Sequence, residues 1–241
     1  MGIIIQKFGG TSVADREKLF RAAKIITDAA SAGSSVVAVV SAQGDTTDEL
    51  LKKAAEIGPA PSKRELDALL ATGESASSAL LAMAVGELGF PAVSLAGWQM
   101  GVFTESVHGN AKILRIDTER ILSELQKGNI VIAAGFQGTD ARNDITTLGR
   151  GGSDTTAVAL AAALHADACR IYKDVDGVYS ADPRIEHGAK KYDVISYDEM
   201  LKLAQSGAQV LHIPCIELAK REKVVIEVLS TFEDKPGTVV K

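Results

Sequence analysis

The chain has 241 residues, of which 46% are hydrophobic and 24% are charged. These proportions are typical of a globular protein with a sizeable core. No proline-rich or serine-rich linker divides the sequence, so we expect one domain spanning residues 1–241. The formal net charge is −5 and no basic stripe is present, which disfavours a nucleic-acid-binding protein.

Cysteine and histidine spacing gives no sign of a disulfide or of a zinc site. Cys169 and Cys215 form no C-x-x-C pair, and the four histidines lack a spacing such as H-x-x-x-H. We therefore assign no metal-ligating side chain. The N-terminus lacks the length and cleavage region of a signal peptide, and no run approaches about eighteen uninterrupted apolar residues. The sequence predicts a cytoplasmic protein with no membrane partner.

Short apolar runs alternate with longer segments of helical spacing along the chain. Strands are predicted at residues 3–6, 35–41, 92–95, 130–134, 169–172 and 224–228. Helices are predicted at residues 14–32, 63–88, 117–127, 154–165, 197–206 and 216–223. Strands that are apolar on both faces and alternate with helices indicate an α/β protein with a mainly parallel sheet covered on each side. Ligands bind beyond the carboxyl ends of such strands.

Two glycine loops lie where a predicted strand meets a helix. Lys7-Phe-Gly-Gly-Thr-Ser12 follows the first strand, and its glycines let backbone amides point inward around an anion. The alternative is an ordinary turn with a surface lysine. Thr146-Thr-Leu-Gly-Arg-Gly-Gly-Ser-Asp-Thr-Thr156 leads into an apolar helix, and Arg150 can bind a carboxylate through two parallel hydrogen bonds. Asp154 alone could merely cap that helix.

Two further polar loops follow strands, at residues 41–47 and 172–184. The second is too long for a simple connection. None of the four loops matches the P-loop pattern or the G-x-G-x-x-G dinucleotide pattern. These absences disfavour a P-loop kinase and a dehydrogenase, but four glycine-bearing loops still indicate a multiply charged ligand.

Several motifs together resemble aspartokinases, within the amino-acid kinase family. They run in order along nearly the whole chain: Lys7-Phe-Gly-Gly-Thr-Ser-Val13, Leu70-Ala-Thr-Gly-Glu74, Gly97-Trp-Gln99, Ala134-Gly-Phe-Gln-Gly138, Gly149-Arg-Gly-Gly-Ser-Asp-Thr-Thr-Ala157, Asp174-Val-Asp-Gly-Val-Tyr179 and Ile195-Ser-Tyr-Asp-Glu-Met200. The resemblance implies a three-layer αβα sandwich around a mainly parallel sheet. It also implies Mg²⁺-ATP as donor, L-aspartate as acceptor, 4-phospho-L-aspartate as product and assembly into a homo-oligomer. This reaction is the first step toward lysine, threonine and methionine.

The resemblance also implies roles for individual residues. Lys7 and Asp154 are expected to be catalytic, with Lys7 on the transferring phosphate and Asp154 orienting it. The residues expected to bind aspartate are Thr47, Glu74, Arg150 and Ser153. The residues expected to bind the nucleotide are Gly9, Gly10, Ser41, Lys173, Asp174, Tyr179 and Arg184. This agrees with the chemistry, because a carboxylate acceptor is already ionised at pH 7 and needs no general base.

The sequence departs from the family pattern at three places. Gln209 stands where many relatives carry a lysine that reaches nucleotide phosphate, and Pro214 stands where the family often has the arginine of H-x-R. Aspartokinases usually continue into regulatory ACT domains, whereas this sequence ends at Lys241 and predicts a catalytic domain without one. A trimmed domain and a stand-alone relative both fit.

Two other functions stay open. One is a kinase for another small carboxylate such as N-acetylglutamate, which the acidic side chain of Glu74 disfavours because it suits a free amino group. The other is a nucleotide-binding or amino-acid-binding subunit without catalysis. Gln209 and Pro214 keep that alternative open, and the presence of Lys7 and Asp154 opposes it.

Overall fold

A computed structural model describes residues 2–181, 186 and 188–241. In chain order its elements are β1 (Ile3–Phe8), the short 3-10 helix η1 (Gly10–Val13), α1 (Arg16–Ser31), β2 (Ser35–Val40), α2 (Thr46–Ile57), α3 (Lys63–Glu87), β3 (Ala92–Leu95), β4 (Val102–Thr104), β5 (Ile113–Ile116), α4 (Glu119–Gln126), β6 (Ile130–Ala134), β7 (Gln137–Thr139), β8 (Ile145–Thr147), α5 (Gly152–Ala163), β9 (Ala168–Lys173), β10 (Val194–Ile195), α6 (Tyr197–Gln205), α7 (Ile213–Glu222), β11 (Ile226–Ser230) and β12 (Thr238–Val240).

Eight strands form the central sheet, in the order β10-β12-β11-β9-β1-β2-β6-β3. The six strands from β11 to β3 are mutually parallel. β12 runs antiparallel to β11 and carries β10 beside it. The predicted mainly parallel sheet is therefore confirmed, and all six predicted strands belong to it.

Alternating side chains along each strand point into two separate apolar layers, one on each face of the sheet. In β2, Val37 and Val39 face one layer, while Val36, Ala38 and Val40 face the other. Each of these five side chains is at most 1% exposed. A strand that is apolar on both faces has to be covered on both faces, because an uncovered face would leave its apolar side chains in contact with water.

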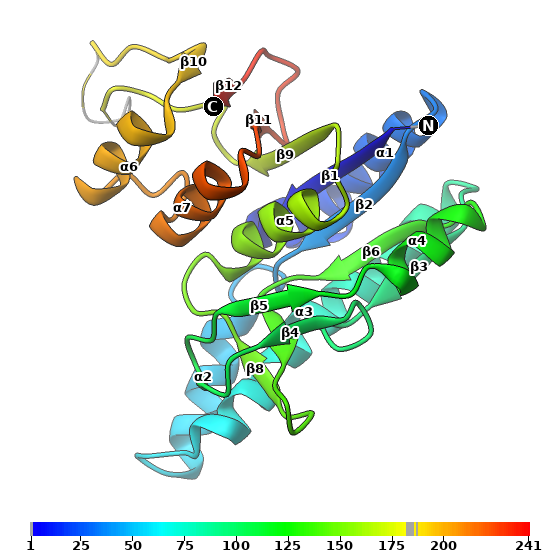
Figure 1. The fold of residues 1–241 in the computed structure, drawn as a ribbon, viewed down its shortest axis with the longest axis vertical. Helices are drawn as coiled ribbons and strands as arrows, with labels where there is room; N and C mark the ends of the chain where they lie inside the picture. Colours follow the sequence, from blue (N-terminus) through cyan, green and yellow to red (C-terminus); the bar gives the residue numbers. More distant parts are fainter. Residues whose placement is uncertain (1, 182–185, 187) are drawn as a thin grey trace.

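Helices supply that cover from both sides (Figure 1). α1 and α3 pack on one face of the sheet, with Ile26 and Leu81 fully buried there. α4, α5, α6 and α7 pack on the other face, where Leu160 and Met200 are fully buried. The protein is thus a three-layer αβα sandwich, as the motifs predict.

A second, smaller sheet is not predicted by the sequence. It has four strands in the order β5-β4-β7-β8, and it lies beside α3 and α2 (Figure 1). β4, β7 and β8 are only three residues long, and β7 and β8 are mostly polar. They therefore give no apolar run to detect. The helix α2 is also absent from the prediction, and it begins at Thr46, inside the predicted loop at residues 41–47.

The α3 helix is long and apolar enough to cross a membrane by length and composition, with a mean hydropathy of 1.4 in its most apolar window. Half of that window is buried within the protein. Leu81 and Val85 pack against the sheet, and the acidic side chains of Asp67 and Glu74 are also buried. These contacts are those of a core helix.

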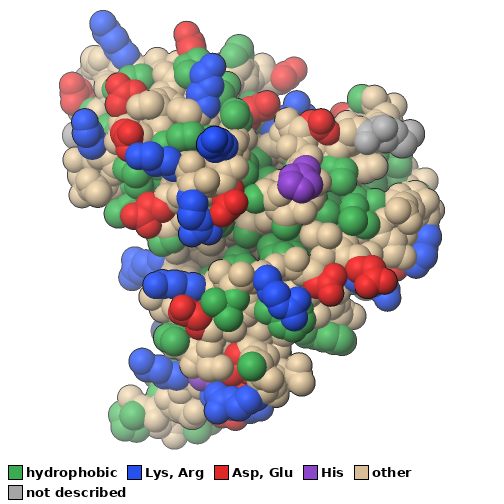
Figure 2. Space-filling view, viewed as in Figure 1, with side chains coloured by type: hydrophobic (Ala, Val, Ile, Leu, Met, Phe, Trp, Pro, Cys, Tyr) green, Lys and Arg blue, Asp and Glu red, His purple; other side chains and the backbone are tan. Residues whose placement is uncertain are grey.

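Charges on the surface are mixed. Lys and Arg side chains are interspersed with Asp and Glu over the face seen in Figure 2.

One ion pair links two strands of the central sheet. It joins Arg170 of β9 to Glu227 of the neighbouring strand β11 at 2.9 Å.

Candidate active site

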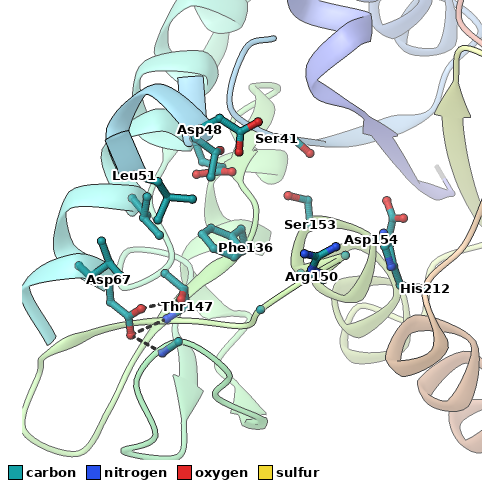
Figure 3. A pocket seen from close by; sticks show the side chains of 18 of the residues that line it. Ser41, Asp48, Leu51, Asp67, Phe136, Thr147, Arg150, Ser153, Asp154 and His212 are labelled. Atoms are coloured by element: carbon teal, nitrogen blue, oxygen red, sulfur yellow. Dashed lines mark hydrogen bonds between the residues drawn. The ribbon is translucent and has the colours of Figure 1, made fainter. Parts of the chain in front are cut away.

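A cavity of about 700 Å³ opens where β1, β2, β6 and β9 reach their carboxyl ends. Its lining comes from the predicted loops, from α2, α3 and β8, and from the segments around Gly109, Phe136 and His212. The lining residues are Lys7, Ser41, Thr47, Asp48, Leu51, Leu66, Asp67, Leu70, Glu74, Gly109, Phe136, Thr147, Gly149, Arg150, Gly151, Gly152, Ser153, Asp154, Lys173 and His212. Figure 3 shows Asp67 and Thr147 at one side of it and Asp154 and His212 at the other. In line with the function proposed below, we call the side lined by α3 the acceptor end and the opposite side the phosphoryl end.

The phosphoryl end holds a buried ion-pair cluster. Asp154, in the first turn of α5, lies 2.7 Å from Lys7 Nζ through Oδ1 and 2.8 Å from Lys173 Nζ through Oδ2. Lys7 and Lys173 sit near the carboxyl ends of the adjacent parallel strands β1 and β9. The side chains of Lys7 and Asp154 are 5% and 2% exposed, so this pair is shielded from water.

Burial and charge act together on these groups. Burial alone would raise the pKa of Asp154, but the ammonium groups of Lys7 and Lys173 hold that pKa well below its usual range. Burial lowers the pKa of Lys7 from its ordinary value, and the carboxylate of Asp154 opposes that effect. Burial also lowers the pKa of His212, so this imidazole is neutral at pH 7. The cluster offers a positioned cation to an anionic ligand.

The glycine loop after β1 packs tightly on the loop after β2. Gly44 N donates to Gly10 O at 3.1 Å, and Ser41 N donates to Phe8 O at 3.1 Å. A Cβ on Gly10 would lie 2.5 Å from the carbonyl oxygen of Ala42, so only glycine allows this approach. A Cβ on Gly9 would have only Lys7 Nζ nearby, at 3.6 Å. The backbone beside the Lys7 ammonium is therefore left uncovered by side chains.

Glu74 lies on α3 and is 4% exposed. Its Oε1 accepts a hydrogen bond from Ala42 N at 3.0 Å, whereas Oε2 has no hydrogen-bond partner in the described part of the chain. Burial raises the pKa of Glu74 to about 7, although the hydrogen bond from Ala42 acts to lower it. A buried carboxylate oxygen without a donor favours a ligand that brings a cation or a hydrogen-bond donor.

Arg150 and Ser153 complete the middle of the cavity, together with Thr47 from the start of α2. Arg150 lies between Phe136 and His212, and the Ser153 side chain points toward Ser41 (Figure 3). The predicted residues Lys7, Ser41, Thr47, Glu74, Arg150, Ser153, Asp154 and Lys173 thus line one cavity. Their individual roles stay predictions.

Four residues expected at the nucleotide site stand apart from this lining. Gly9 and Gly10 adjoin it through Lys7, whereas Asp174 and Tyr179 do not line it. The Tyr179 hydroxyl instead donates to Asp176 Oδ1 at 2.8 Å, next to Lys191. Arg184 lies outside the described residues.

A second cavity of about 550 Å³ adjoins the first. Gln209, Pro214 and Gly207 line it, and it shares Arg150 and His212 with the larger cavity. Two of the positions at which the sequence departs from the family pattern, Gln209 and Pro214, therefore lie beside the site, in reach of a ligand that extends past Arg150.

Sequence reasoning finds the predicted aspartate-binding residues through the resemblance, but it misses Asp67, Phe136 and His212, which also line the cavity. Asp67 comes from the interior of α3. Thr147 falls within the predicted glycine loop at residues 146–156, but its place at the end of a strand of the second sheet is not predicted. Phe136 adopts a positive φ of 69° that its residue type does not suggest. His212, whose spacing predicts no ligand role, lines both cavities. The one available signal is the presence of acids on the apolar face of a predicted helix.

One cluster of metal-ligand types occurs outside the lining of the cavity. Ligand atoms of His108, Asp140 and Asp144 lie within 4.8 Å of one another. Arg142 contacts both carboxylates, at 3.3 Å and 3.8 Å, and Arg64 pairs with Asp144 at 2.8 Å. With these guanidinium groups in place, we still assign no metal-ligating side chain.

Comparison with known proteins identifies the family. The model described as the amino acid kinase family matches residues 2–230. The chain belongs to the amino acid kinase family. An aspartokinase of Geobacillus stearothermophilus is 57% identical over 241 residues, which is all of this chain and 59% of that protein. The chain therefore spans less than two thirds of the length of this curated relative.

Solved structures of this family agree with the fold. Aspartate kinase from Synechocystis has a TM-score of 0.89 and 45% identity, and the match covers 99% of this chain and 39% of that one. E. coli aspartokinase III in complex with aspartate and ADP has a TM-score of 0.85 and 29% identity, covering 99% of this chain and 64% of that one. These matches confirm the resemblance to aspartokinases and the amino-acid kinase fold.

Proposed function

We propose that the chain transfers the terminal phosphoryl group of ATP to the side-chain carboxylate of L-aspartate, giving 4-phospho-L-aspartate. One observation carries this proposal. A buried Lys7–Asp154–Lys173 cluster shares a cavity with Arg150 and with a carboxylate oxygen of Glu74 that has no hydrogen-bond partner among the described residues. The cavity thus offers cations to phosphate and carboxylate groups and an anion to an ammonium group. Relatives named aspartokinase, one of them in complex with aspartate and ADP, support the same substrates.

The proposed reaction needs positioning and charge neutralisation more than proton transfer. The acceptor carboxylate is ionised at pH 7, so the problem is to bring two anions together. Lys7 would contact the moving phosphoryl group, and Asp154 would hold the Lys7 ammonium in place at 2.7 Å. Gly9 and Gly10 would present backbone amides to the phosphates, with Ser41 and Lys173 beside them.

At the acceptor end and in the middle of the cavity, four side chains would orient the amino acid. Arg150 would grip a carboxylate with its guanidinium fork, and Glu74 in its ionised form would pair with the ammonium group through Oε2. Thr47 and Ser153 would donate or accept the remaining hydrogen bonds. An ionised Glu74 is unfavourable in its empty pocket and becomes favourable beside a cation, which gives selectivity for a free amino group.

The nucleotide would enter with Mg²⁺. Both oxygens of Asp154 are engaged by ammonium groups, so the cavity suits an ion held by the phosphates and water. Bound in that way, Mg²⁺ supplies neutralisation of phosphate charge. Asp174, Tyr179 and Arg184 would hold the rest of the nucleotide, by resemblance to the family. A cytoplasmic location and a homo-oligomer are part of the same proposal.

Trapping of the product tests the reaction. The chain is incubated with Mg²⁺-ATP, hydroxylamine and one acceptor at a time, and the acyl hydroxamate is measured. Hydroxamate that requires L-aspartate and does not form with L-glutamate or N-acetyl-L-glutamate is the expected result. Hydroxamate with N-acetyl-L-glutamate instead would establish another carboxylate kinase. Measurable ATP binding without any hydroxamate would indicate a binding subunit and refute the proposal.

A further inference from the structure

A second buried carboxylate of α3, that of Asp67, lies at the acceptor end and has no part in the chemistry described above. Asp67 is 1% exposed and faces the same cavity as Glu74, which lies seven residues later on the same helix. Seven residues are close to two helical turns, so the two side chains project from one face of α3.

The carboxylate of Asp67 ties α3 to two separate segments. Its Oδ2 accepts from Thr147 N at 3.1 Å and from Gly109 N at 3.0 Å, and it lies 2.9 Å from His108 Nδ1. Its Oδ1 accepts from Thr147 Oγ1 at 2.6 Å. Figure 3 shows the bonds from Asp67 to Thr147. Both oxygens are occupied, so this carboxylate is not poised to bind a ligand.

Both segments lead to Arg150. Thr147 ends β8, three residues before Arg150. Gly109 adjoins Asn110, and a Cβ on Gly149 would lie 2.6 Å from Asn110 Oδ1. Gly149 also has a φ of +75°. The close approach to Asn110 and this backbone angle both require glycine at the position just before Arg150. The Asp67 hydrogen bonds hold β8 and the 108–110 turn, and this turn rests against Gly149.

We propose that Asp67 is a positioning residue which fixes Arg150 relative to Glu74 and so sets the affinity for the amino-acid acceptor. The proposal rests on the proposed function. One rigid helix carries Glu74 directly and holds the Arg150 loop through Asp67. The separation between the group that pairs with the ammonium and the group that pairs with the carboxylate is therefore fixed within α3. Phosphate contacts at Lys7 and Gly10 come from other elements and are independent of this link.

Substitution of Asp67 separates this role from general stability. In Asp67→Ala the amides of Gly109 and Thr147 lose their acceptor, and the KM for aspartate is expected to rise about 10- to 100-fold, as for a small misplacement of a binding group. The KM for ATP should stay within about twofold, because the phosphate contacts are untouched. Asp67→Asn keeps the shape and one acceptor oxygen for the two amides, and its amide can donate to Thr147 Oγ1, so it should restore most of the affinity.

Asp140 provides a matched control. It is also 1% exposed, and it also accepts two backbone hydrogen bonds, from Arg142 N at 2.8 Å and Asp144 N at 3.0 Å. It lies at the far turn of the same β7–β8 hairpin. Asp140→Ala should lower stability and leave the KM for aspartate within about twofold, because the side chain of Asp140 makes no hydrogen bond to Asp67, to residues 108–110 or to residues 147–150 in the described part of the chain.

Amide hydrogen exchange gives a readout besides activity. Faster exchange at Gly109, Thr147 and the 148–151 segment is expected in Asp67→Ala and not in Asp67→Asn. Should Asp67→Ala fail to fold, Thr147→Val removes only the Oδ1 hydrogen bond and should raise the KM for aspartate about three- to tenfold. If the wild-type protein turns over aspartate and Asp67→Ala has the wild-type KM for aspartate, the proposal is overturned. If Asp67→Ala does not fold, a folded Thr147→Val protein with the wild-type KM for aspartate overturns it in the same way. Wild-type protein without aspartate-dependent turnover refutes the function itself, and the positioning role with it.

Discussion

The two ends of the cavity bury carboxylates in opposite electrostatic situations. At the phosphoryl end, Asp154 is matched by Lys7 and Lys173, and its pKa lies well below the usual range. At the acceptor end, Glu74 has one oxygen without a partner in the described chain, and burial raises its pKa to about 7. The buried carboxylate at the phosphoryl end is therefore already paired with cations before a ligand arrives, whereas the buried carboxylate at the acceptor end gains its partner from the ligand. Neutralising one carboxylate at each end should therefore have effects of opposite sign.

The largest effect is expected for Asp154→Asn. The change leaves two ammonium groups without their carboxylate, and breaking a buried pair in this way costs about 3–5 kcal/mol. Because the pKa of Asp154 is depressed in the folded protein, its stabilisation is present above the ordinary carboxyl pKa near 4 and is lost as the pH falls below it. Urea unfolding at pH 7 measures the loss. Unchanged stability would show that the cluster contributes nothing to the fold.

Removal of the Lys7 cation is next in size. Lys7→Met should lower kcat by about 10²- to 10³-fold, which corresponds to roughly 3–4 kcal/mol of lost transition-state stabilisation. The KM for aspartate should change little, because Lys7 belongs to the phosphoryl end. Steady-state kinetics on protein with a native circular dichroism spectrum provides the measurement. Wild-type kcat in this variant would rule out the assigned role.

Glu74→Gln sharpens the comparison through the sign of its effect. The unfolded carboxyl has a pKa near 4.5 and the folded one about 7, so the contribution of Glu74 to stability is lost as the pH rises through this window. The full loss is about 3 kcal/mol above pH 7. The Gln variant has no such loss, so its stability relative to wild type should increase between pH 5 and pH 8. Parallel unfolding curves at the two pH values for both proteins would contradict the elevated pKa.

The smallest effect concerns substrate affinity. The ionised Glu74 is the form that pairs with an ammonium group, and the ionised fraction rises about tenfold between pH 6 and pH 8 for a pKa of about 7. The apparent KM for aspartate should fall by about that factor over this range. The same titration with Glu74→Gln should be nearly flat. A flat profile in the wild-type protein would mean that Glu74 does not titrate in the empty site.

The sequence predicts the phosphoryl end better than the acceptor end, for a physical reason. Lys7 and Ser41 lie at the carboxyl ends of apolar strands, and Asp154 lies in a glycine-bearing segment that opens an apolar helix. Parallel strands bring such segments together at one edge of the sheet. The motifs alone are therefore enough to locate the chemistry at that edge. The three-layer sandwich follows from the same apolar strands and helices.

The acceptor end depends on contacts that leave little trace in the sequence. Glu74 is found only through resemblance to the family, because an acid on the apolar face of a predicted helix is a weak signal that does not indicate a ligand. Asp67 and Thr147 meet through three-residue, largely polar strands, which local patterns do not reveal. The positive φ of Phe136 is likewise set by tertiary packing. Tertiary contacts, and not local propensity, build this half of the site.

Discrimination between a free and a blocked amino group tests the central claim most directly. The kcat/KM for L-aspartate is compared with that for N-acetyl-L-aspartate, in the wild-type protein and in Glu74→Gln. We expect the wild-type protein to prefer L-aspartate by about 10²-fold or more, because a blocked amine leaves the buried carboxylate unpaired. In Glu74→Gln that preference should nearly vanish. An equally strong preference in both proteins would contradict the assignment of the acceptor end.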